Sequence, residues 1–302
     1  MRLLITGAFH KDTSFFDEVS ALGHKITYVQ DERISLLEQG IDPAAFDGVI
    51  CNGLFQYTPI EQFTKLRMIQ LTSTGYDRVP MEYIQSHHIA LYNARDVYSV
   101  PMAEFALCGV LMLYKRIHFF ADHQRNHIWE KQRELLELCG KTVCIIGCGS
   151  VGTECAKRFK AFGCRVVGVN RTAKELACFD QILPLTYLDE ALPYADVVVL
   201  SISLTEETRY LMDTRRFALL RDGAVLVNVA RGALLNEQAL LAWLQSGRSG
   251  GCALDVFETE PLEESSLLWG MEHAILTPHC SFAGDHNCDR LHEVILKNLL
   301  QQ

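Results

Sequence analysis

Three ionisable residues in the last third of the chain, Arg231, Glu260 and His279, could act together in one reaction. Each follows a short apolar stretch that we expect to be a β-strand, so each would lie at a strand end. A histidine can donate a proton and recover it near neutral pH, and a carboxylate beside it would fix its ring. An arginine is permanently charged and can bind a carboxylate through two hydrogen bonds. Such a set suits the reduction of a 2-oxo acid, which needs a proton donor at the carbonyl oxygen and a cation for the carboxylate.

Taken one at a time, the same residues have ordinary interpretations. Arg231 could cap a helix or pair with an acid, Glu260 could be a solvated loop residue, and His279 could be a histidine with a purely structural role. The sequence alone does not show that the three side chains meet.

The hydride for such a reduction would come from a nicotinamide cofactor, and residues 141–152, KTVCIIGCGSVG, are typical of a site for one. An apolar run that predicts a buried strand leads into Gly147, Gly149 and Gly152, and helical periodicity follows. The first glycine permits a tight turn, the second lets a pyrophosphate approach the backbone, and the third lets helix and strand pack closely. Free N–H groups at the helix start would bind the phosphates, although the glycines could also mark a turn with only a structural role. The expected contacts are Gly147, Gly149, Ser150, Val151 and Gly152.

The choice between NAD(H) and NADP(H) depends on the end of the next predicted strand, 165–169. An NAD site usually carries Asp or Glu there, which holds the ribose hydroxyl groups. This chain has Asn170 and Arg171 instead, and an arginine can pair with a 2′-phosphate that a carboxylate would repel. We therefore expect NADP(H), with NAD(H) as the alternative and a solvated loop residue as the ordinary interpretation of Arg171. The further cofactor contacts expected at this and later strand ends are Asn170, Arg171, Thr172, Ser203, Thr208, Val229 and Ala230.

Strands alternate with helices along the chain, a pattern typical of α/β proteins whose parallel sheets are covered on both faces. We expect a first alternating region in residues 1–92, with a short helix at 34–38, and a second region that begins at residue 141. A long helical pattern at 99–120 would connect them, followed by a helical arm or loop at 122–137. Such sheets bind ligands at the carboxyl ends of their strands.

The composition fits a soluble protein of two domains, with 302 residues of which 49% are hydrophobic and 22% charged. A net charge of −9 without a basic block argues against nucleic acid or an anionic membrane surface as a partner. The eleven cysteines lie in apolar patterns without any C-x-x-C pair, so we expect reduced thiols, no metal site and a cytoplasmic location. The first residues, MRLLITGAF, predict a strand rather than a signal peptide.

Three segments resemble signatures of the D-isomer-specific 2-hydroxyacid dehydrogenases: VNVARGALLNEQAL around Arg231, ALDVFETEPL around Glu260 and ILTPHCSF around His279. The segments TSTGYDRV and NARDVYSVPMAEFAL resemble the substrate loop and the interdomain helix of that family, so the resemblance covers nearly the whole chain. The family includes glyoxylate/hydroxypyruvate reductases and D-3-phosphoglycerate dehydrogenases. The resemblance implies an NAD(P)-dependent oxidoreductase that interconverts a small 2-oxo acid and its D-2-hydroxy acid.

Position by position, the resemblance makes His279 the acid/base, Glu260 its supporting carboxylate and Arg231 the residue that binds substrate. It implies that Asp255 holds the nicotinamide carboxamide. The backbone N–H groups of two loop residues, Thr74 and Gly75, would receive the substrate carboxylate in a nest-like site. The implied substrate-binding set is Leu54, Thr74, Gly75, Arg231 and His279.

The resemblance also implies a discontinuous architecture. A Rossmann nucleotide-binding domain at 99–277 would be inserted into a flavodoxin-like substrate domain made of 1–98 and 278–302, with the active site in the cleft. The resemblance implies two partners. One is the small-molecule substrate, and the other is a second copy of the chain, in a homodimer built on the nucleotide-binding domains. Trp129 would reach the neighbouring subunit's cleft or would be an ordinary tryptophan of the dimer surface.

The chain departs from the family pattern at several places. Asn170 and Arg171 replace the usual acidic residue, Ser203 replaces a common proline, and residues 280–282 replace a glycine-rich stretch. We also expect no regulatory domain, which argues against a serine-regulated phosphoglycerate dehydrogenase. The alternative function is a nucleotide-sensing, corepressor-like binding protein on the same scaffold, against which the lack of a long polar tail and of a basic run argues.

Overall fold

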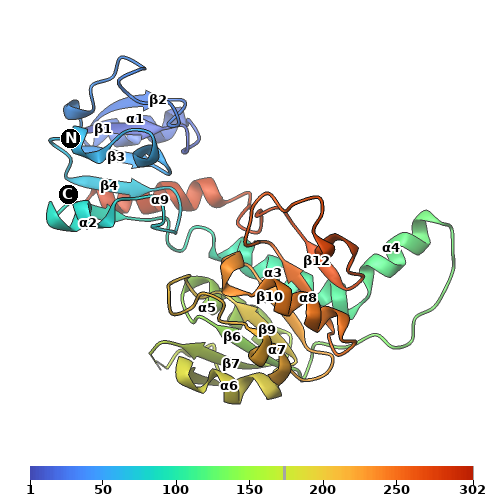
Figure 1. Cartoon of the computed structure of the whole chain (residues 1–302). Coiled ribbons are helices and arrows are strands. Elements are labelled where there is room, and N and C mark those ends of the chain that lie inside the picture. The colour runs from blue at the N-terminus through green and yellow to red at the C-terminus, as the bar shows by residue number, and fades with distance from the viewer. Residues whose placement is uncertain (173–174, 302) are drawn as a thin grey trace. The chain divides into compact units, whose positions relative to one another are not determined.

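The computed structural model describes residues 1–172 and 175–301, and the chain forms two compact units. Unit 1 comprises Met1–Val97 and Gly284–Gln302, and unit 2 comprises Tyr98–Ala283. The chain therefore leaves unit 1, builds unit 2 and returns. Each unit contains one parallel sheet covered by helices, as the alternating sequence pattern predicts (Figure 1).

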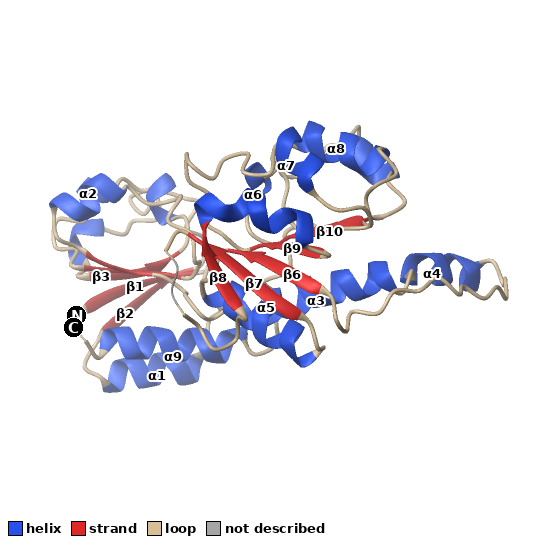
Figure 2. Cartoon of the chain, turned by 90° about the horizontal axis from the view of Figure 1, so that it is seen from below, coloured by secondary structure: helices blue, strands red, loops and turns tan. Residues whose placement is uncertain are grey.

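The sheet of unit 1 has five parallel strands in the order β2-β1-β3-β4-β5, which is the order of flavodoxin-like folds. Figure 2 shows α1 (Thr13–Ala21) and α9 (Asn287–Leu299) on one face of this sheet and α2 (Met81–Ser86) on the other. The central strands are short apolar runs that are buried on both faces, as a covered parallel sheet requires. The five strands are β1 (Arg2–Thr6), β2 (Lys25–Val29), β3 (Gly48–Cys51), β4 (Met68–Leu71) and β5 (Ala90–Tyr92).

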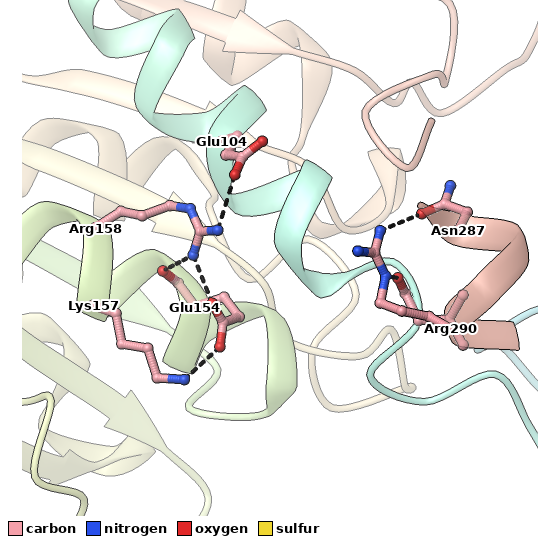
Figure 3. A network of polar contacts seen from close by, with 7 residues as sticks. Glu104, Glu154, Lys157, Arg158, Asn287 and Arg290 are labelled. Atoms are coloured by element: carbon pink, nitrogen blue, oxygen red, sulfur yellow. Dashed lines mark hydrogen bonds and ion pairs between the residues drawn. The ribbon is translucent and has the colours of Figure 1, made fainter. Parts of the chain in front are cut away.

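Helix α9 is held in unit 1 by contacts with segments that are distant in sequence. The Nε atom of Arg290 donates to the carbonyl oxygen of Val97 at 2.7 Å, and its Nη2 atom donates to Asn287 at 2.8 Å (Figure 3). The ring of His292 stacks on Phe15 of α1, with 4.4 Å between the ring centroids. The two ends of the chain are thereby joined in one unit.

The sheet of unit 2 has seven parallel strands in the order β12-β11-β10-β9-β6-β7-β8. Counted from β6 as the first strand and read from β8, the order is 3-2-1-4-5-6 with a seventh strand added, which is the Rossmann arrangement. The predicted fold class, a flavodoxin-like lobe and a Rossmann lobe with parallel sheets, is therefore confirmed. The strands are β6 (Thr142–Ile146), β7 (Arg165–Asn170), β8 (Gln181–Pro184), β9 (Val197–Leu200), β10 (Val225–Asn228), β11 (Gly251–Leu254) and β12 (Ala274–Leu276).

Helices cover both faces of the sheet of unit 2 (Figure 2). On one face lie α3 (Ser99–Tyr114) and α5 (Ser150–Ala161), whose buried side chains pack on the valines and isoleucines of the strands. The other face is covered by α6 (Leu188–Ala191), α7 (Thr214–Leu219) and α8 (Glu237–Gln245). These helices bury an almost wholly apolar sheet, so the polar residues that it contains require a separate explanation.

Three elements differ from the sequence-based expectation. The helical pattern at 99–120 is broken, because α3 ends at Tyr114 and Arg116 adopts a left-handed conformation (φ 50°) before α4 (Ile117–Arg125) begins. The helix predicted at 34–38 is a series of turns, in which the Gln39 side chain donates to the carbonyl oxygens of residues 31 and 34. Strand β8 was not predicted, since it is a half-exposed edge strand that ends in a proline.

Within residues 1–172 and 175–301, no helix combines the length and the apolar character that crossing a bilayer requires.

The two later glycines of the turn after β6 give a matched pair of substitutions. A Cβ atom at Gly152 would lie 1.9 Å from the carbonyl oxygen of Gly147, whereas a Cβ atom at Gly149 would meet nothing within 4 Å. We expect Gly152→Ala to lower the free energy of unfolding by about 1–3 kcal/mol, because backbone atoms cannot move aside cheaply. Gly149→Ala should leave it nearly unchanged. Denaturant unfolding of both variants is the measurement, and equal losses would contradict the close packing of α5 on the turn.

Candidate active site

The residues predicted to form the site all lie at or beyond the carboxyl end of a strand. Because the strands of each sheet are parallel, these ends lie along one edge of that sheet. In unit 2 the predicted cofactor contacts follow the first strands: the glycine turn follows β6, Asn170–Thr172 end β7, and Ser203 and Thr208 follow β9. The later strand ends carry the remaining residues: Val229–Arg231 after β10, Asp255 and Glu260 after β11, and His279 after β12. In unit 1 Leu54 follows β3, and Thr74 and Gly75 follow β4.

The glycine turn has the geometry that its spacing predicts. Gly147 has φ 102°, a conformation that favours glycine, and its N–H donates to the carbonyl oxygen of Val169 at 2.8 Å. A Cβ atom on Gly147 would lie 2.5 Å from the nitrogen of Ile202, so no other residue fits there. Cys148, between the first two glycines, is buried, and burial raises the pKa of its thiol to about 12. That thiol is therefore protonated at neutral pH and unsuited to nucleophilic chemistry.

The start of α5 fits an anion such as a pyrophosphate. Gly149 is the N-cap residue and forms no side-chain capping bond, so the first N–H groups of the helix have no intrahelical or capping partner. The open space at Gly149 leaves room for a ligand to approach the backbone. The hydroxyl group of Ser150 pairs with that of Ser99, which begins α3. The observed turn, cap and open face match the requirements of a dinucleotide.

Besides the pair of hydroxyl groups of Ser99 and Ser150, an ion pair joins helices α3 and α5. Arg158 of α5 donates to Glu104 of α3 at 3.0 Å and to Glu154 of its own helix at 2.6 Å (Figure 3). Lys157 pairs with the other oxygen of Glu154 at 2.5 Å. The helix that presents its N-terminus to the glycine turn is therefore held along its length.

The end of β7 carries the residues that bear on the choice of cofactor. The Asn170 side chain donates to the carbonyl oxygen of Thr172 at 3.2 Å and closes the turn. Arg171 is exposed, and within residues 1–172 and 175–301 it forms no hydrogen bond or ion pair. Its guanidinium group is therefore available to a ligand.

The turn after β9 is organised by Thr208. Its side chain is buried, and its hydroxyl group donates to the carbonyl oxygen of Ser203 at 2.8 Å and accepts from the N–H of Thr205 at 2.8 Å. Thr208 thus fixes the loop internally, while Ser203 is exposed at its surface. The side chain of Val229, another predicted cofactor contact, is buried in the core of unit 2, so its backbone is the part that can meet a ligand.

His279 and Glu260 form a pair. The Nδ1 atom of His279 lies 2.7 Å from Oε2 of Glu260, and Oε1 of Glu260 accepts from the N–H of Phe257 at 3.0 Å. Both oxygens of the carboxylate are thus engaged, and the ring is held through one nitrogen. The His279 side chain is 44% exposed, and its second ring nitrogen forms no hydrogen bond with the described residues. The ring of Phe282 stands edge-on to the imidazole at 6.3 Å between centroids.

Asp255 fixes the loop that carries His279. Its side chain is fully buried, and its carboxylate accepts from the Thr277 hydroxyl at 2.7 Å and from the N–H groups of Cys280 and Ser281, each at 2.8 Å. The backbone oxygen of Asp255 also accepts from the N–H of His279 at 2.8 Å. These bonds hold His279 at φ 50°, a left-handed conformation that is costly for a residue other than glycine. A carboxylate has about four acceptor positions, and the Cys280 thiol is a fourth hydrogen-bond partner beside these three donors.

Arg231 lies on a turn that a second buried polar residue, Asn228, organises. The Nη1 atom of Arg231 donates to the carbonyl oxygen of Ala230 at 2.7 Å. The side chain of Asn228 contacts the backbone on both sides of Arg231. Asn228 was not among the predicted site residues, although an amide inside the apolar strand 225–228 is a signal that could have indicated it.

In unit 1 the turn after β4 offers unused donors. Within the described ranges, the N–H groups of Thr74 and Gly75 donate to no other group, while the carbonyl oxygen of Thr74 accepts from Asn93 at 2.8 Å. This turn can therefore receive an anion. Leu54 is fully buried in the core of unit 1, so only its backbone is placed to meet a substrate.

In the part of the chain that the structure describes, no three His, Cys, Asp or Glu side chains are grouped to hold a metal ion.

Comparison with known proteins points to one family. Residues 107–281 match the model described as D-isomer specific 2-hydroxyacid dehydrogenase, NAD binding domain. A glyoxylate reductase of Thermococcus gammatolerans is 30% identical over 278 residues, which are 89% of this chain and 79% of that protein. A D-3-phosphoglycerate dehydrogenase of Methanocaldococcus jannaschii is 31% identical over 284 residues, which are 92% of this chain and 53% of that protein.

A solved structure shares both the fold and part of the sequence. The D-isomer specific 2-hydroxyacid dehydrogenase from Xanthobacter autotrophicus Py2, in complex with NADPH and MES, matches with a TM-score of 0.80 at 26% identity. The match covers 99% of this chain and 94% of that chain. These three relatives are named as a reductase or a dehydrogenase, and none is named as a corepressor.

Proposed function

We propose that this chain, which belongs to the D-isomer-specific 2-hydroxyacid dehydrogenase family, interconverts a small 2-oxo acid and its D-2-hydroxy acid with a nicotinamide cofactor. The observation that carries the proposal is the pair of His279 and Glu260, 2.7 Å apart, at the sheet edge that also bears Arg231 and the glycine turn. Glyoxylate and hydroxypyruvate are the substrates we favour, and a phosphoglycerate-type substrate is the alternative. The similarity to a glyoxylate reductase over most of both chains supports that order.

Each residue has a separate role in the proposed reaction. When bound, the nicotinamide supplies the hydride. His279 donates a proton from Nε2 to the carbonyl oxygen of the substrate, while Glu260 holds the ring through Nδ1 and stabilises the imidazolium form. Arg231 binds the substrate carboxylate and polarises the carbonyl. The N–H groups of Thr74 and Gly75 are the anion-binding donors of unit 1.

Unit 2 is the nucleotide-binding domain of this proposal, and unit 1 is the substrate domain. The pyrophosphate would contact the turn and helix start at Gly147–Gly152, with Thr208 and the backbone of Val229 and Ala230 beside it. We assign the nicotinamide carboxamide to Asp255 because of its place in the segment ALDVFETEPL, which resembles the family signature.

The test of this function is a spectrophotometric screen of NADH and NADPH against glyoxylate, hydroxypyruvate, pyruvate, phenylpyruvate and phosphohydroxypyruvate. We expect turnover of at least one acid, and we expect His279→Ala to lower kcat by about 10²–10⁴-fold, as loss of an acid/base does. Glu260→Gln keeps a hydrogen-bond acceptor but removes the charge, so it should lower kcat less than His279→Ala does.

His286→Ala is a matched control, because His286 also lies near carboxylates but is exposed in unit 1. It should retain full activity. Unchanged turnover in His279→Ala would show that the acid/base is another group.

We propose that NADP(H) is the preferred cofactor, because Arg171 is exposed and available at the position where an acidic residue would favour NAD(H). We expect Arg171→Ala to weaken NADPH binding by about 1–3 kcal/mol, the contribution of a charge-assisted hydrogen bond to phosphate, and to spare NADH. Fluorescence titration of both cofactors is the measurement. Arg165→Ala, at the opposite end of β7, should change neither affinity. If Arg171→Ala weakened the binding of NADPH and NADH equally, the result would favour NAD(H) and contradict the proposed preference for NADP(H).

We propose that the chain forms a homodimer through an arm made of residues 117–136. Helix α4 has no buried residue, and the arm extends away from the sheet of its own unit (Figure 1). Its base is closed by Lys115, which donates to the carbonyl oxygen of Leu136 at 2.7 Å. Trp129 on this arm is 95% exposed, an arrangement that favours burial against a second copy.

Trp129→Ala should therefore weaken the dimer. A buried tryptophan at an interface often contributes 2 kcal/mol or more, so we expect the dissociation constant to rise about 30-fold or more. Sedimentation equilibrium measures this constant. Trp269→Ala, which removes another exposed tryptophan of unit 2 outside the arm, is the control and should have no effect. A monomeric parent protein would refute the proposed dimer.

A further inference from the structure

We propose that Asn228 is a positioning residue for Arg231. Its buried side-chain amide holds the turn from which the guanidinium group meets a substrate carboxylate. The inference rests on the proposed function, because it takes Arg231 as the residue that binds substrate.

The amide of Asn228 bonds to the backbone on both sides of Arg231. Its Oδ1 atom accepts from the N–H of Ala230 at 3.1 Å, and its Nδ2 atom donates to the carbonyl oxygen of Arg231 at 2.9 Å. One rigid planar group thus spans the turn. Since Nη1 of Arg231 also donates to the carbonyl oxygen of Ala230, the guanidinium group rests on the same short piece of backbone. A shift of that backbone would move the charged group with it.

The strand residues around Asn228 are apolar. It is 0% exposed, it ends a strand that otherwise reads Val225, Leu226 and Val227, and its partners on both neighbouring strands are leucines, Leu200 and Leu254. Burying an amide is unfavourable unless its donor and acceptor are satisfied. Both side-chain hydrogen bonds of Asn228 that the structure shows are made to the Arg231 turn. The amide therefore serves that turn rather than the packing of the sheet.

Two further contacts make the turn a fixed point of the site. Gly232 follows Arg231 directly, and a Cβ atom there would lie 1.9 Å from the carbonyl carbon of Phe257, so the turn is packed tightly on that side. The backbone oxygen of Asn228 accepts from the N–H of Asp255 at 3.0 Å, and the backbone oxygen of Asp255 accepts from the N–H of His279. A main-chain path thus joins the Arg231 turn to the loop of the acid/base.

The experiment is a double-mutant cycle on the full-length protein with its cofactor bound. We expect Asn228→Ala to raise KM for the 2-oxo acid about 10- to 100-fold, the range in which small displacements of a binding group act, with a smaller change in kcat. In an Arg231→Ala background the same substitution should have almost no further effect on kcat/KM, because the group that it positions is gone. Asn228→Ser, which keeps one hydrogen-bonding group, should recover part of the loss.

Asn236→Ala is the matched control. Asn236 lies in the same unit, and its side chain also holds a backbone N–H, that of Ala239, but it does not contact the Arg231 turn. It should lower the melting temperature without raising KM. Equal losses of kcat/KM from Asn228→Ala in both backgrounds, or an unchanged KM, would overturn the positioning role.

The outcomes separate this inference from the proposed function. If the parent protein reduces no 2-oxo acid and its cofactor complex does not bind oxamate, an unreactive 2-oxo acid analogue, the proposed function fails. If the parent is active and the cycle shows no coupling, only the role of Asn228 fails. Should Asn228→Ala not fold, the cycle is run with Asn228→Ser. Hydrogen exchange at the Ala230 amide gives a readout that is independent of turnover, and unchanged protection in the variant would also contradict the inference.

Discussion

The parallel pairing of the seven strands in unit 2 is the constraint on which the site depends. Parallel strands end at a common edge, and the strand order reverses at β6, which is the place where open α/β sheets bind ligands. The glycine turn occupies one side of that point, and the residues after β10, β11 and β12 continue along the same edge. The glycine turn and His279, about 130 residues apart in sequence, are brought to one edge by the parallel pairing of the strands.

Two buried polar side chains, Asn228 and Asp255, turn this edge into a defined site. Asp255 holds His279 at φ 50°, a backbone conformation that costs about 1–3 kcal/mol for a residue with a Cβ atom. Its carboxylate accepts three hydrogen bonds from the same loop, which fix the chain on both sides of His279. Asn228 fixes the neighbouring turn in the same manner with a neutral amide. The positions of His279 and Arg231 thus depend on two buried side chains that hold the backbone around them.

Much of the fold could be predicted from local sequence patterns, because strands buried on both faces are continuous apolar runs and glycine spacing marks a tight turn. The helix expected at 34–38 was wrong: the segment forms turns, and the Gln39 side chain donates to the carbonyl oxygen of Ile34, which a helix would pair with the N–H of Glu38. The pairing of His279 with Glu260 was expected only from family resemblance, because a contact between residues 19 positions apart has no local signal. The role of Asp255 depends on hydrogen bonds to residues 22 to 26 positions away, which sequence spacing does not reveal. Asn228 bonds only to residues two and three positions ahead, so its amide in an apolar strand was a local signal.

A crystal structure of the chain with NADPH and oxamate tests the central claim most directly. The claim is that the edge formed by β10, β11 and β12 holds the groups that bind and protonate a 2-oxo acid. The predicted result is an oxamate carbonyl oxygen within about 2.6–3.2 Å of Nε2 of His279, with its carboxylate on Arg231 and Nδ1 still paired with Glu260. Oxamate bound elsewhere, or a His279 ring turned away from Glu260 in the complex, would contradict the account.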